Sequence, residues 1–119
     1  MLATWFPADQ TVAMQTRHVD DVRRPSDQAV LARPLLDGDQ SSVRIIRLGP
    51  TQALPPHRHG ASDLMLYVVS GAGQLDGPDG GQSFAAGELA YLRGDEELRV
   101  RNVGSDELTL LAFIAPKLA

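Results

Sequence analysis

The sequence of 119 residues contains no cysteine. This absence excludes disulfide bonds, thiolate metal ligands and cysteine nucleophiles, and it fits a reducing compartment. Long apolar runs are also missing, because no stretch approaches the ~20 residues that cross a bilayer. The opening MLATWFPADQ has no charged leader followed by an apolar core, so we expect no signal peptide. We therefore expect a soluble, cytoplasmic protein.

Basic clusters and aromatic residues are scarce. Lysine and arginine number 11 against 15 acidic residues, the formal net charge is -4, and aromatic residues make up 5% of the chain. Nucleic-acid surfaces combine basic patches with aromatic side chains, and anionic membranes attract basic segments. We therefore expect neither nucleic acid nor a membrane as a partner. A phosphate-binding glycine loop and a Gly-x-Ser-x-Gly elbow are also absent.

What the sequence does contain is a series of short β-branched and apolar segments, separated by turn residues about every eight to twelve positions. One segment, DQTVAMQTRHVDDVRR, is compatible with a short turn or helix, which Pro25 would end. No other segment shows a sustained helical period, so the sequence predicts an all-β domain closed into a barrel. The expected strands are residues 28–36, 42–48, 64–70, 73–75, 82–86, 88–92, 98–102 and 108–114.

The chain divides into an N-terminal arm, residues 1–27, and a barrel, residues 28–115. Trp5 and Phe6 are large apolar residues in that arm, and such residues usually dock on something. Two interpretations stay open: the arm packs on a partner subunit, or it covers its own barrel. Met14 leaves open whether the residues before it are an upstream start.

His57 and His59 are the first candidates for chemistry. They lie two positions apart, and in an extended segment this spacing places both rings on one face. Two neutral imidazoles can share a divalent cation such as zinc, iron, manganese or nickel, provided that a further protein ligand is present. The alternative is that two histidines at a junction of loop and strand only form hydrogen bonds.

The residues around this pair resemble the cupin superfamily. A His57-x-His59 pair preceded by two prolines and followed by an apolar strand and Gly71 is similar to the first cupin motif, and residues 87–102 are similar to the second. The resemblance covers roughly residues 28–114 and implies a double-stranded β-helix, or jelly-roll barrel. It also implies a pocket inside one end, frequent homodimers and, in most members, a divalent metal held by four ligands.

Several positions depart from the family pattern. Leu64 stands where the resemblance places the glutamate ligand. The histidine ligand of the second motif is replaced by Glu97 if one counts forward from Gly94, or by Leu98 if one counts back from Asn102. Two of the four usual ligands are therefore lost. Two turn positions differ as well, with Thr51 in place of glycine and Leu92 in place of proline.

Neighbouring residues offer substitutes for the lost ligands. Asp63 precedes Leu64, and strand alternation turns it to the other face unless the strand begins only at Leu64, in which case Asp63 can bend inward. Glu97 would complete a triad of two histidines and one carboxylate, which is typical of iron sites. An inward-facing Leu98 would instead leave Glu97 outside. His18 is a further candidate, from a segment of uncertain place.

The histidines can also act without metal, because an unperturbed pKa near 6.5 suits proton transfer around neutral pH. We therefore name His57 and His59 as catalytic candidates, and His57, His59 and Glu97 as metal candidates. The aliphatic residues nearby either line a pocket or belong to the ordinary core. The expected lining comprises Leu64, Leu66, Leu89, Tyr91 and Leu98.

Three functions follow from this pattern. The first is an enzyme of small-molecule, or secondary, metabolism: a metal-dependent oxygenase or isomerase, or a metal-free cyclase, isomerase or dehydratase. The second is a ligand-binding or sensory protein without turnover, and the third is a structural subunit. The loss of two ligand positions favours the functions that need little or no metal. The retention of both histidines argues against a purely structural role. The expected partners are a small organic molecule and a second copy of the chain.

Overall fold

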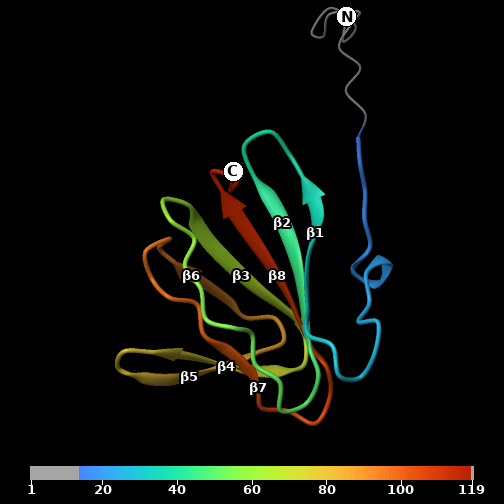
Figure 1. Ribbon diagram of the computed structural model, residues 1–119, viewed down its shortest axis with the longest axis vertical. Helices are drawn as coiled ribbons and strands as arrows, with labels where there is room; N and C mark the ends of the chain where they lie inside the picture. The colour runs from blue at the N-terminus through green and yellow to red at the C-terminus, as the bar shows by residue number, and fades with distance from the viewer. Residues whose placement is uncertain (1–13, 119) are drawn as a thin grey trace, which may run out of the picture.

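The computed structural model describes residues 14–118 and confirms the all-β prediction (Figure 1). Eight strands and one short 3-10 turn make up its regular structure within that range. No helix of this part of the chain is long and apolar enough to span a membrane. The elements are η2 (Val19–Asp21), β1 (Leu31–Asp37), β2 (Ser42–Leu48), β3 (Asp63–Ser70), β4 (Ala72–Gly77), β5 (Gly80–Ala85), β6 (Leu89–Leu92), β7 (Val100–Asn102) and β8 (Leu108–Ala115).

The strands form two antiparallel sheets. A five-stranded sheet has the order β1-β2-β8-β3-β6, and a three-stranded sheet has the order β5-β4-β7. Figure 1 shows the larger sheet upright and the smaller sheet crossing below it. Crossing of sheets at a large angle lets side chains of both inner faces meet in one core.

The core follows from strand alternation. On β3, Leu64, Leu66 and Val68 are buried, whereas the intervening Met65 is 51% exposed. The three buried side chains join a cluster that also contains Phe84 of the smaller sheet. A period of two thus gives the larger sheet an inner face toward the smaller sheet and an outer face away from it.

The segment before β1 packs on the outer face of its own sheet. Of the two expected alternatives, a short turn or a helix, the described residues show the turn η2, which His18 caps by accepting a hydrogen bond from the Asp20 amide. Arg47 of β2 donates to the carbonyl groups of Val19 and Val22 and holds this segment in place. Trp5 and Phe6 lie outside the described residues.

Two residues at the motif positions, Gly71 and Thr51, lie in turns and have positive φ angles. Gly71 has a φ of 89°, and a Cβ there would lie 2.6 Å from the Glu107 carbonyl oxygen. Only glycine fits such a position. Thr51, in the place of the first glycine of the motif, also has a positive φ of 68°, which is strained for a β-branched residue.

Candidate functional site

The two histidines lie in the loop between β2 and β3, which runs beside the segment leading into β7. His57 and Leu98 form an antiparallel bridge: the Leu98 amide donates to the His57 carbonyl at 2.8 Å, and the His57 amide donates back at 3.4 Å. The two imidazole centroids are 4.6 Å apart. His57 is exposed and its Nδ1 lies 3.0 Å from the Pro55 carbonyl oxygen, whereas His59 is only 5% exposed. The rings therefore form a pair that leads from solvent to the interior.

His59 is the chemically unusual member of this pair. Its Nδ1 is buried and has no hydrogen-bond partner among the described residues. Burial lowers the pKa of His59 below 6.5, and the positive charges of His57 and Arg44 lower it further. The buried imidazole is therefore neutral at pH 7, with one ring nitrogen available to a further group.

The places of the lost metal ligands are filled by leucine. Leu98 lies directly opposite His57, as the count back from Asn102 expects of the residue in the histidine's place. Leu64 is fully buried in the core cluster together with Leu98. Two of the neighbours that a metal would need are thus aliphatic.

Glu97 does not join the histidines, which corrects the expectation that it completes a triad. Its carboxylate accepts a hydrogen bond from Arg99 Nε at 2.5 Å and lies 3.8 Å from Arg58 Nη1. The cause is strand alternation: Leu98 faces inward, so its neighbour Glu97 faces the charged outer side.

The other proposed substitutes also lie elsewhere. Asp63 accepts a hydrogen bond from the Tyr91 hydroxyl at 3.1 Å on the outer face, and His18 caps η2. Residues 14–118 contain no group of three histidine, aspartate or glutamate side chains placed to hold a metal ion. Two imidazoles among leucines do not fit a resident divalent metal, because such metals need more donors.

The expected lining residues divide between the two faces of the sheet. Leu64, Leu66 and Leu98 are buried in the core. Leu89 and Tyr91 are 73% and 56% exposed, so the expectation that they line the interior is wrong. The register explains this, because Tyr91 pairs with the outward-facing Met65.

Sequence reasoning missed Arg44. On β2, Arg44 lies two and four positions before Ile46 and Leu48, which belong to the core cluster. Residues at this spacing share a face, so the Arg44 side chain lies on the inner face. It lines a recess of about 260 Å³ between the ends of β1, β2 and β8, together with Ser42, Ile114 and other residues. The sequence signal was weak, because SVRIIRL places an arginine on each face and two isoleucines side by side, so its pattern does not show which face is inward.

Known proteins match the chain as follows. A family model described as Cupin domain matches residues 44–114. An uncharacterized conserved protein with a double-stranded β-helix domain from Klebsiella pneumoniae is 22% identical, with a TM-score of 0.79 over 87% of this chain and 91% of that one. An RmlC-like cupin protein from Desulfovibrio desulfuricans is also 22% identical, with a TM-score of 0.78 over 89% of this chain and 100% of that one.

A third similar structure is KdgF from Halomonas sp., which is 11% identical, with a TM-score of 0.75 over 89% of this chain and 96% of that one. At such identities the likeness shows the fold. No curated protein matches the chain. The family model covers more than half of the sequence, and the structures share the double-stranded β-helix that the motifs predicted. The chain therefore belongs to the cupin family.

Proposed function

We propose that this cupin binds a small organic molecule beside His57 and His59 and acts on it by metal-independent proton transfer, as an isomerase or cyclase does. The observation that carries the proposal is the buried Nδ1 of His59, which has no partner among the described residues. Buried polar atoms are nearly always paired, and an unpaired one costs free energy. A ligand atom would supply the missing partner.

The histidine pair suits proton transfer. A lowered pKa keeps His59 neutral near pH 7, so the ring can accept a proton from a bound molecule. His57 lies next to it and is exposed, so it can exchange protons with water. Passing a proton from one ring to the other requires that the rings lie close together, and their centroids are 4.6 Å apart.

A second candidate is a binding protein without turnover. Leu64 and Leu98, which stand where the resemblance places two ligands, favour it because they supply no metal-binding or reactive group. Both candidates place the bound molecule beside His57 and His59, and they differ in whether that molecule is changed.

The experiment starts from untagged protein. Bound metals are measured by elemental mass spectrometry, and bound organic molecules by native mass spectrometry after mild purification. We expect substoichiometric metal and a carried ligand that the His57→Ala, His59→Ala double variant loses. His18→Ala is the matched control, since His18 only caps η2.

The outcomes separate the candidates. Conversion of the carried ligand by the parent protein supports the enzyme, and an unchanged ligand supports the binding protein. Stoichiometric metal in the parent, lost in the double variant, would contradict metal-independent chemistry and favour an oxygenase or another metalloenzyme.

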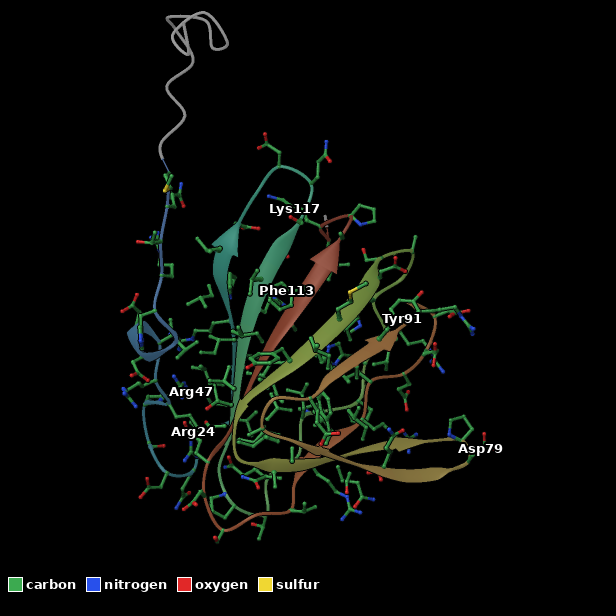
Figure 2. All side chains as sticks on the ribbon, turned by 180° about the vertical axis from the view of Figure 1, so that it is seen from behind. Arg24, Arg47, Asp79, Tyr91, Phe113 and Lys117 are labelled. Atoms are coloured by element: carbon green, nitrogen blue, oxygen red, sulfur yellow. The ribbon has the colours of Figure 1, made fainter. Side chains whose placement is uncertain are left out.

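We also propose that a second copy of the chain covers the outer face of the larger sheet. Met65 pairs with Phe113 on one side and Tyr91 on the other, and Leu89 lies in the next row beside Tyr67. Figure 2 shows Phe113 on β8 and Tyr91 on β6. Contiguous exposed apolar side chains are typical of protein interfaces, and a two-fold pair would bury this face against itself.

A further inference from the structure

We propose that the ligand of this site is a small organic acid whose carboxylate is bound by Arg44. This inference rests on the proposed function, because the acid would occupy the same site as the molecule on which His57 and His59 act.

The first support is the position of Arg44 within the fold. Its cross-strand neighbours are Pro34 and Ala112, and its own strand continues on the same face with Ile46 and Leu48. Arg44 is half-buried in this apolar setting. Removing a charge from water is costly unless the charge is paired.

The second support is that Arg44 has no such pair within the described residues. The ion pairs of residues 14–118 involve seven other arginine side chains, and none includes Arg44. The protein carries a net charge of -4, so carboxylates are not in short supply. An unpaired guanidinium on an inner face is therefore available for an anion from outside the chain.

The third support is the charge balance of the recess that Arg44 lines. Lys117 and Asp37 also line it, but Lys117 Nζ lies 3.5 Å from Asp37 Oδ1, so these two charges offset each other. Arg44 leaves the recess positive. Ser42 adds a hydroxyl group and Ile114 an apolar wall. This combination fits a small molecule with one acidic group and an apolar body.

The fourth support links the recess to the histidines. The Ser62 amide donates to the His59 carbonyl, and the Ser62 hydroxyl donates to the carbonyl of Pro116, the residue before Lys117. The histidine loop is thus tied to the end of β8 that borders the recess. The Arg44 charge also acts on His59, so the two groups lie within electrostatic reach. A carboxylate in the recess would accept from the Arg44 guanidinium, which binds carboxylates in a bidentate manner.

The test uses the full chain and probes of matched shape: hexanoate against hexanamide, and benzoate against benzamide. Affinity is measured by titration calorimetry, and NMR follows the Arg44 Nε–H signal and the His59 ring. We expect each carboxylate to bind at least about tenfold more tightly than its amide. Arg44→Met should remove this preference and leave the amide affinity unchanged.

Two further variants keep the result interpretable. Arg33→Met is the matched control, because Arg33 is exposed on β1 and its loss changes the net charge equally. Arg44→Lys keeps the charge without the planar fork, so an intermediate preference is expected.

Each contrary outcome has a distinct meaning. If amides bind as tightly as carboxylates, or if Arg44→Met keeps the preference, the proposal that Arg44 binds a carboxylate is wrong, while the proposed ligand site beside the histidines is retained. If no probe shifts the His59 signals, both the acid and the proposed site are overturned.

Discussion

Arg44 and Arg47 lie three positions apart on β2, on opposite faces of the same sheet. Arg47 is 4% exposed, and its guanidinium donates to Glu107 and Thr109 at 2.9 Å and to two carbonyl groups of the N-terminal segment. Arg44 has no ion pair with any described residue. Figure 2 shows Arg47 beside Arg24, where the N-terminal segment meets the sheet.

The difference separates a structural arginine from an available one. The donors of Arg47 are used to attach the chain's own segment, which explains why its burial is tolerated. The donors of Arg44 are directed toward a recess. Two identical side chains on one strand therefore differ in role: Arg47 stabilises the fold, and Arg44 is the residue that we propose binds a ligand.

The largest effect that would test this contrast is on stability. Arg47→Met should lower the free energy of unfolding by about 3 kcal/mol, because it leaves the Val19 and Val22 carbonyl groups without their donor and removes one of the two arginine partners of Glu107. Arg44→Met should change it by less than about 1 kcal/mol. Urea unfolding of both variants measures this. Equal losses in the two variants would remove the distinction.

The outer face of the larger sheet, on which Arg47 lies, should bind a second copy of the chain, whereas the inner face should bind the ligand. Met65→Glu places a charge in the middle of the exposed apolar row, so the proposed dimer should dissociate and the molecular mass in solution should halve. Light scattering after gel filtration measures the mass. Val103→Glu, at an equally exposed apolar residue outside this sheet, is the control. A parent protein that is already a monomer would disprove the dimer.

A smaller effect is expected on the stability of the fold at acidic pH. The pKa of His59 is lowered by burial, by His57 and by Arg44. Above pH 6.5 the ring is neutral in both folded and unfolded chains and contributes nothing. As the pH falls from 6.5 toward the lowered pKa, the unfolded chain takes up the proton first, so stability declines and then levels off.

The two arginines should differ in this respect too. NMR titration of His59 should show a pKa that rises toward 6.5 in Arg44→Met and stays unchanged in Arg47→Met, because only Arg44 is among its causes. An unchanged pKa in Arg44→Met would mean that Arg44 lies too far from the histidines to share a ligand with them.

The smallest effect on stability is expected at Thr51, which follows β2 and lies on neither face of the sheet. Thr51 holds a φ of 68°, a conformation that costs a residue with a Cβ roughly 1–2 kcal/mol. Thr51→Gly relieves this strain but loosens the unfolded chain, so a net gain of about 0.5–1 kcal/mol is expected in urea unfolding. Thr51→Ala, which keeps the Cβ, should gain less. A loss of stability in Thr51→Gly would show that the threonine side chain is needed there.

Much of the fold was predictable because the strands alternate clearly. β2 coincides with the expected residues 42–48, and β3 and β8 differ from expectation by one residue at one end. Of the short turn or helix expected before Pro25, the described residues form the single turn η2, and Arg47 bonds to the carbonyl groups that follow and begin it. On β6, Leu89 and Tyr91 have the apolar character of core residues, but Ala90 and Leu92 are the ones that pack inward.

The sequence by itself determined the β architecture, the adjacency of His57 and His59, and the loss of two metal ligands. These properties depend on local alternation and spacing, which a linear chain records. Only the tertiary structure decided that Leu98 lies opposite His57, that Glu97 pairs with Arg99, and that Arg44 forms no ion pair with any residue from 14 to 118. Such relations depend on which distant strands pair and in which register, because long-range pairing selects the neighbours of every inward side chain.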